Sequence, residues 1–203
     1  MDLGLQAYPA PQDNYHPLPD DYLAILQARK HLALTIMGKD PYPTDPIGIP
    51  FCKPTWETMR DDGTSGFHVL RSLGVDIQFA VQRYPLPTEL FCALAEHHGI
   101  AFLNLSYHFL DGPCREGQHA MELVAAEEIN GPICQVSNTL LLCGEANKRR
   151  WFGTPHPRSF AVVHPDVRNQ ISQHRDIRAK WVKWWTPNAV AAMFALNLTP
   201  IDQ

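Results

Sequence analysis

Four short, almost wholly apolar runs recur along the chain, and helical stretches separate them. The runs occupy residues 32–37, 100–104, 139–143 and 160–164. Turn-forming residues bound each run, which is typical of strands that are buried on both faces of a sheet. Strands that alternate with helices need crossover connections, and these imply a parallel sheet covered by helices. The sequence therefore predicts an α/β fold, a three-layer α/β/α sandwich around a central four-stranded parallel sheet.

Apolar residues at helical spacing predict the outer layers of this fold. The predicted helices cover residues 87–98, 121–136, 176–185 and 188–196. A chain of 203 residues with 45% hydrophobic content is large enough for one core, so we expect a single domain over residues 1–203. Its proline-rich first ~20 residues are expected to be irregular. Trp181, Trp184 and Trp185 favour a role in the core over a base-stacking platform.

Targeting signals and metal motifs are not recognisable in the sequence. No basic stretch precedes an apolar run at the start, and no apolar run approaches the roughly 20 residues that span a bilayer. We therefore expect a cytoplasmic protein without a membrane partner. The five cysteines are widely spaced and form no C-x-x-C pair, which favours free thiols. We expect no metal and no cofactor, although His108, Cys114 and His119 leave a metal site open as an alternative.

Positive charge is concentrated near the C-terminal end of an acidic chain. The formal net charge is −4, but nine basic and two acidic residues lie between Lys148 and Lys183, so that segment carries +7 and the rest −11. A solvated helical face is one interpretation. A phosphate-binding edge is the interpretation we favour, because charge segregated in this way gives one face a positive field. We expect Lys148 and Arg149 to contact DNA.

Polar side chains follow three of the four predicted strands. Asp40 comes after the first, Asn104 ends the second, and His164 ends the fourth. Taken singly, these residues have structural explanations: an aspartate can shape a turn, an asparagine can satisfy a buried backbone group, and a histidine can lie in the core. The carboxyl ends of parallel strands meet at one edge of the sheet, however, so we expect the three side chains to share one crevice.

These residue types suit the release of a planar heterocycle from a sugar. Asn104 can donate and accept hydrogen bonds at a base edge that offers both an N–H and a carbonyl group. His164 can stabilise negative charge on the departing base. Asp40 can position a water molecule or stabilise an electron-poor sugar, as carboxylates do in glycoside hydrolysis. Phe51 supplies a ring for stacking.

The same segments resemble the motifs of the uracil-DNA glycosylase superfamily. The resemblance covers about residues 30–185 and rests on Gly38-Lys39-Asp40-Pro41-Tyr42-Pro43, Gly48-Ile49-Pro50-Phe51, Phe102-Leu103-Asn104-Leu105 and His164-Pro165-Asp166-Val167-Arg168-Asn169. The first motif is similar to that of the first family, and the last is partly similar to that of the single-strand-selective monofunctional enzymes. The chain departs from the common motifs at Lys39, Pro43 and Asp166.

The resemblance implies a role for each residue of these motifs. Asp40 and His164 would be catalytic, with His164 stabilising the uracil anion. The base would be bound by Gly38, Tyr42, Phe51 and Asn104, and the Tyr42 ring would exclude thymine at C5. Arg168 and Asn169 would contact DNA, Arg168 as a wedge in the vacated base stack or, alternatively, as a phosphate or carboxylate partner.

The function expected from these observations is a monomeric, monofunctional DNA glycosylase of base excision repair. It would flip uracil or a related deaminated base out of DNA and hydrolyse the N-glycosidic bond. Two alternatives remain open. One is a DNA- or damage-binding module with the same fold and altered catalysis, and the other is a hydrolase of small nucleosides.

Overall fold

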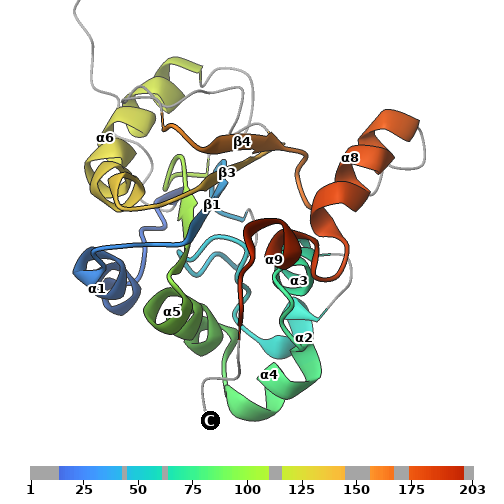
Figure 1. The fold of residues 1–203 in the computed structure, drawn as a ribbon. Coiled ribbons are helices and arrows are strands. Elements are labelled where there is room, and N and C mark those ends of the chain that lie inside the picture. Colours follow the sequence, from blue (N-terminus) through green and yellow to red (C-terminus); the bar gives the residue numbers. More distant parts are fainter. Residues whose placement is uncertain are drawn as a thin grey trace, which may run out of the picture.

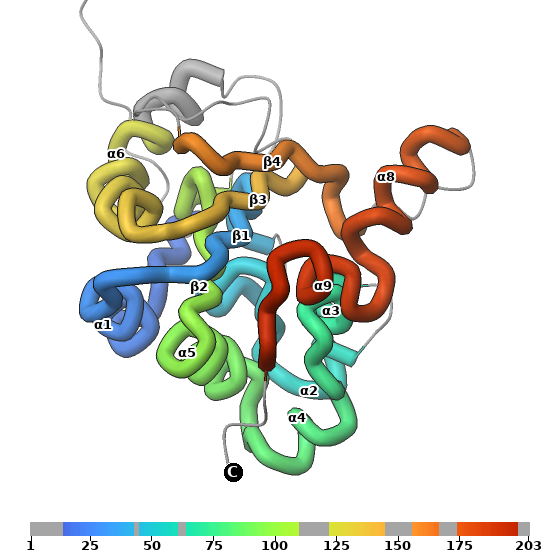
Figure 2. Tube along the Cα trace, viewed as in Figure 1, coloured from blue at the N-terminus to red at the C-terminus, as the bar shows by residue number. Residues whose placement is uncertain are grey.

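A parallel four-stranded sheet forms the centre of the protein in the computed structural model, which describes residues 14–42, 45–60, 64–109, 116–144, 156–166 and 174–198. The strands are β1 (Leu34–Gly38), β2 (Ile100–Asn104), β3 (Leu140–Cys143) and β4 (Ser159–Val162). They lie in the order β2-β1-β3-β4, so β1 lies between β2 and β3, with β4 beyond β3 (Figure 2). The predicted α/β fold with a four-stranded parallel sheet is confirmed.

Helices cover both sides of the sheet. Figure 1 shows α1 (Asp20–Ala28), α5 (Pro87–His98) and α6 (Glu116–Gln135) on one side, and α3 (Ser65–Ser72), α8 (Arg175–Trp185) and α9 (Ala189–Phe194) on the other. Every residue of β1 and β2 is buried between these layers. β4 is an exposed edge strand instead, and Phe160 is 37% exposed, because only β3 pairs with it among the described strands.

The predicted helices are present, with shifted ends in three cases. The helix predicted over residues 87–98 matches α5, which has Pro87 in its first turn and ends at Gly99 in the left-handed conformation. Both are favourable helix-end signals, because proline needs no hydrogen-bond partner at the start and glycine adopts positive φ without strain. The helix predicted from residue 121 begins at Glu116 instead. Trp184 and Trp185 of α8 are core residues, as expected.

Three short helices between β1 and α5 were not predicted from the sequence. They are α2 (Trp56–Met59), α3 and α4 (Ile77–Arg83). Each follows a residue whose side-chain oxygen accepts hydrogen bonds from the backbone N–H groups of the first turn: Thr55 before α2, Thr64 before α3 and Asp76 before α4. Such N-caps satisfy donors that the helix itself leaves unpaired, and they fix where these helices begin.

Side chains from two helices complete the outer edge of β2. The Tyr22 hydroxyl of α1 accepts a hydrogen bond from the Phe102 N–H at 2.9 Å, and the Asn130 amide of α6 donates to the Asn104 carbonyl at 2.8 Å. Tyr22 is fully buried, and its burial strongly raises the pKa of the hydroxyl, so the group stays neutral. A strand edge buried in this way needs such partners, because an unpaired buried backbone group is costly.

Replacing Tyr22 with phenylalanine should destabilise the fold, because the change leaves the Phe102 N–H buried without its acceptor. We expect a loss of about 1–3 kcal/mol in the free energy of unfolding, measured by urea denaturation. Tyr15→Phe is the matched control, since Tyr15 is 44% exposed, and it should cost under about 0.5 kcal/mol. Equal losses in the two variants would contradict this role for Tyr22.

Candidate functional site

Parallel pairing brings the first two predicted site segments together. Gly38 at the end of β1 is in register with Asn104 at the end of β2. The pairing continues past both strands, because the Leu105 N–H donates to the Gly38 carbonyl and the Ser106 N–H donates to the Lys39 carbonyl, each at 3.0 Å. The loop that carries Asp40 therefore leaves the sheet directly beside Asn104.

Gly38 provides the space in which two predicted base-binding side chains approach each other. A Cβ atom at this position would lie 2.6 Å from the Asn104 side-chain oxygen and 3.4 Å from the tip of the Phe51 ring. Any other residue would require the Asn104 side chain to move from this place. One wall of the site is thus formed by three residues that were predicted separately from the sequence: Gly38, Phe51 and Asn104.

Phe51 occupies this wall in an unusual backbone conformation. Its φ is 64°, a region that aromatic residues seldom adopt, and its side chain is buried. The carbonyl oxygen of Phe51 fits against Gly66, where a Cβ atom would lie 1.8 Å from it. The strained conformation is held by the surrounding loop and by α3, and strain of this kind is often concentrated at functional sites.

Asp40 lies in the same crevice, next to a charge of opposite sign. Its carboxylate is 3.2 Å from the Lys39 ammonium, and the two side chains are 14% and 28% exposed. Lys39 is one of the departures from the family motif, and in the structure it forms an ion pair with the predicted catalytic carboxylate. The ion pair thus lies in a place that is mostly shielded from water.

The Tyr42 ring lies against a cation, and its hydroxyl is shielded from water. Burial raises the pKa of its hydroxyl to about 12, and the Ser65 hydroxyl and the Gly66 backbone oppose that shift only in part. The Lys53 ammonium lies 3.8 Å from the centre of the ring, a close cation–π contact. Desolvation lowers the pKa of Lys53, which fits a lysine that lies over an aromatic face. Sequence reasoning identified Tyr42 but neither Lys53 nor Ser65.

His164 faces this wall from the loop after β4. Its ring centre is 6.4 Å from that of Phe51, and the planes are tilted by 40°. Partial burial lowers the pKa of the imidazole, although the Asp166 carboxylate and backbone act in the opposite direction, so the neutral form prevails at neutral pH. Nδ1 accepts a hydrogen bond from the Asp166 N–H at 3.1 Å. The neutral ring consequently carries its hydrogen on Nε2.

Two tryptophans of α8 hold the loop on both sides of His164. The Trp185 indole donates to the Val163 carbonyl at 2.8 Å, and the Trp181 indole donates to the Pro165 carbonyl at 2.7 Å. Gly144, after β3, supplies the space, because a Cβ atom there would lie 2.9 Å from the His164 Cβ. These anchors fix the imidazole relative to the sheet.

A buried hydrogen-bond chain supports Asn104 from behind. The Tyr107 hydroxyl donates to the Asn130 side-chain oxygen at 2.7 Å, and the Asn130 amide donates to the Asn104 carbonyl. Sequence reasoning missed Asn130, because a polar residue in a helical stretch resembles a solvent-facing one. Beside this chain, Ser106 donates to the buried Glu122 carboxylate at 3.1 Å, and the His108 ring is 3.6 Å from it.

One cavity of about 820 Å³ contains the predicted catalytic and base-binding residues. One wall comprises residues 38–42 and 46–51 with Ser65, Asn104 and Phe109, and the other comprises Gly144, residues 161–164, Asp166, Ile177, Lys180 and Trp184. The cavity thus unites Asp40, Tyr42, Asn104 and His164 with the Phe51 ring. The predicted DNA-contacting residues Lys148, Arg149, Arg168 and Asn169 lie outside the described residues.

The described part of the chain shows neither a metal centre nor a membrane span. No group of three or more histidine, cysteine, aspartate or glutamate side chains there is arranged to hold a metal ion. Among the same residues, no helix has the length and apolar character needed to cross a bilayer.

Comparison with known proteins identifies the fold. No protein-family model matches the sequence, and no curated protein sequence matches it. The wild-type UNG structure from Nitratifractor salsuginis is similar, with 14% identity, coverage of 83% of this chain and 79% of that chain, and a TM-score of 0.46. A tyrosine-to-glycine mutant of that UNG gives 15% identity, coverage of 82% and 80%, and a TM-score of 0.50. The predicted uracil-DNA glycosylase-like fold is therefore confirmed.

The lowered pKa of His164 has a consequence for stability. The native imidazole binds its proton less readily than the unfolded chain does, so wild-type protein should lose stability as the pH falls below about 6.5. His164→Gln removes this titration. As the pH falls from about 7 to about 5, we expect the wild type to lose more unfolding free energy than the variant. Urea denaturation at each pH measures both values. A difference that stays constant over this range would contradict the lowered pKa.

Proposed function

We propose that this chain, which has the fold of UNG, is a monofunctional DNA glycosylase that hydrolyses the N-glycosidic bond of uracil or a related deaminated base. The observation that carries the proposal is the convergence of Asp40, Asn104, His164 and Phe51 on one cavity at the strand ends. A cavity of this kind, with a few polar groups among apolar walls, is a favourable place for a planar ligand. Its substrate would be DNA with the damaged base flipped out of the stack.

Each side chain has a position that suits one part of the reaction. Phe51 stacks on the base, and the Asn104 amide reads its edge. As the bond between C1′ and the base nitrogen breaks, its electron pair leaves with the base, and the His164 Nε2–H donates to the base oxygen that gains negative charge. Asp40 stabilises the electron-poor sugar and orients a water molecule, whose oxygen bonds to C1′ while one of its protons passes to the Asp40 carboxylate.

Lys39 supports hydrolysis rather than strand cleavage. A glycosylase that also cleaves the strand needs a neutral amine to attack C1′. The Lys39 ammonium forms an ion pair with Asp40 at 3.2 Å, and an ammonium group has no lone pair available for attack. This pairing supports water as the nucleophile, with a free base and an abasic site as the products.

A damage-binding module without catalysis is the second candidate, and Asp166 is the observation that favours it. This exposed carboxylate lies in the cavity lining two residues after His164 and repels phosphate. A module of this kind would bind uracil-containing DNA in a salt-sensitive manner and release no base. The decisive experiment is a release assay with uracil, hypoxanthine and xanthine in single-stranded and duplex DNA, in which alkali-sensitive abasic sites are detected. Absence of product on every substrate would overturn the glycosylase proposal.

Asp40→Asn should reduce base release by about 10²–10³-fold while DNA binding is retained, because the carboxylate charge acts mainly in the transition state. Single-turnover release and fluorescence anisotropy measure the two effects. Asp45→Asn is the matched control, since Asp45 is an exposed aspartate near the same loop, and it should release base at nearly the wild-type rate. Full activity of Asp40→Asn would refute the role of this carboxylate.

Tyr42→Ala should allow slow release of thymine, because the change removes the ring that fills the C5 side of the cavity. Discrimination against one extra methyl group is worth about 10–200-fold in a close-fitting site, so we expect the uracil-to-thymine ratio to fall by about that factor. The measurement compares release rates from oligonucleotides that differ only in this base. Unchanged rejection of thymine would mean that another group guards C5.

A further inference from the structure

Apart from His164, the second wall of the cavity has no role in the chemistry of the base. It is formed by the end of β4 and by one face of α8, and it includes Val163, Ile177, Lys180 and Trp184. The whole cavity, at about 820 Å³, is near the upper end of the ~300–1,000 Å³ that encloses a drug-sized ligand, whereas a pyrimidine base is smaller than such a ligand. Space for more of the substrate therefore adjoins the base-binding wall.

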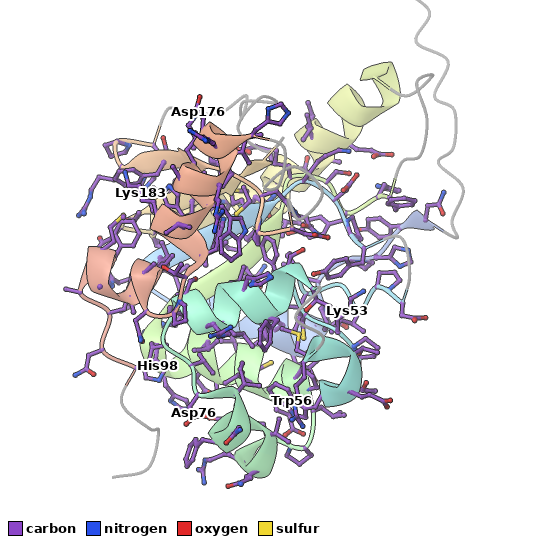
Figure 3. All side chains as sticks on the ribbon, turned by 90° about the vertical axis from the view of Figure 1, so that its right-hand side faces the viewer. Lys53, Trp56, Asp76, His98, Asp176 and Lys183 are labelled. Carbon is purple, nitrogen blue, oxygen red and sulfur yellow. The ribbon has the colours of Figure 1, made fainter. Side chains whose placement is uncertain are left out.

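The face of α8 that lines this space combines apolar contact with one positive charge. Ile177, Lys180 and Trp184 are spaced by three and four residues, so they lie along one side of the helix. Trp184 is buried, Ile177 is half-buried, and Lys180 is exposed. In Figure 3, Asp176 and Lys183 mark the two ends of the helix, and Lys180 lies between them in the sequence.

The position of this face relative to His164 is fixed. The indoles of Trp181 and Trp185 bind carbonyls on both sides of the histidine. Lys180 directly precedes the first of these two anchors, so its backbone cannot move away from the cavity without breaking a hydrogen bond of 2.7 Å. The part of α8 that presents Lys180 to the cavity is therefore held beside the loop that carries His164.

The two lysines of the described cavity lining, Lys39 and Lys180, lie in different electrostatic surroundings. The Lys39 ammonium forms an ion pair with the Asp40 carboxylate at 3.2 Å. Lys180 is the other lysine in the described lining, which also includes Asp166. Lys180 is exposed and brings a positive charge to this lining, and such a charge can attract a phosphate group.

We propose that Lys180 and the apolar face of α8 form a subsite for the phosphodiester next to the flipped nucleotide. The inference rests on the proposed function, because it assigns a polynucleotide rather than a free nucleoside as substrate. The Lys180 ammonium binds the phosphate as a point charge, and the side chains of Ile177 and Trp184 cover the adjoining sugar.

A double-mutant cycle between protein and DNA tests the subsite. The binding partner is a fluorescent single-stranded oligonucleotide with one uracil, and its affinity is measured by anisotropy in the Asp40→Asn background. The oligonucleotide is used unmodified and with an uncharged methylphosphonate on the 5′ or on the 3′ side of the deoxyuridine. Lys180→Met should weaken binding of the unmodified strand about three- to tenfold. The substitution should have little effect on the strand in which the methylphosphonate replaces the contacted phosphate, because that group carries no charge. This strand shows whether Lys180 contacts the phosphate on the 5′ or on the 3′ side of the deoxyuridine.

Arg178→Met is the matched control for the loss of one positive charge on α8. Residues two positions apart point to opposite sides of a helix, and Arg178 is exposed and absent from the cavity lining. Lys180→Met should reduce the slope of log affinity against log salt by about 0.7 on single strands, and Arg178→Met should reduce it less. Lys180→Arg should restore most of the affinity.

The outcomes separate the subsite from the proposed activity. Equal effects of Lys180→Met and Arg178→Met, or equal effects of Lys180→Met on all three strands, would overturn the subsite even if the protein releases uracil. The subsite is supported if Lys180→Met weakens binding of the unmodified strand but not of the strand with one particular methylphosphonate. Failure of the wild type to release any base would refute the glycosylase and leave this binding result standing as evidence for a DNA-binding groove.

Discussion

The parallel pairing of β1 with β2 is the constraint on which the site depends. It sets Gly38 opposite Asn104, and two further backbone hydrogen bonds carry the pairing into the loop that holds Asp40. A shift of one residue in this register would turn Asn104 to the other face of the sheet. The carboxylate and the amide therefore leave the sheet side by side because of backbone geometry.

The opposite wall depends on a different kind of contact. β4 is an exposed edge strand, and the loop after it is held by side chains of α8 instead of by a neighbouring strand. The two walls of the cavity are thus built independently, one by sheet pairing and one by a docked helix. A site of this construction can change the α8 wall while the wall formed at the ends of β1 and β2 stays intact.

Sequence patterns predicted the layers of the fold and the meeting of three polar residues in one cavity for physical reasons. Buried parallel strands have continuous apolar runs, and their carboxyl ends must meet, so Asp40, Asn104 and His164 were expected in one crevice. The supporting residues were not predictable in the same way. Lys53 reaches the Tyr42 ring, and Asn130 reaches the Asn104 carbonyl, only through tertiary contacts that no spacing along the chain specifies.

The completed edge of β2 has a consequence for how the protein behaves in a crowded solution. An open sheet edge offers a row of backbone groups to which a strand of another chain can add. Tyr22 occupies the Phe102 N–H and Asn130 occupies the Asn104 carbonyl, so two of the groups that an incoming strand would need are already bound. The hydrogen bonds that steady Asn104 thereby also protect this side of the molecule from edge-to-edge aggregation.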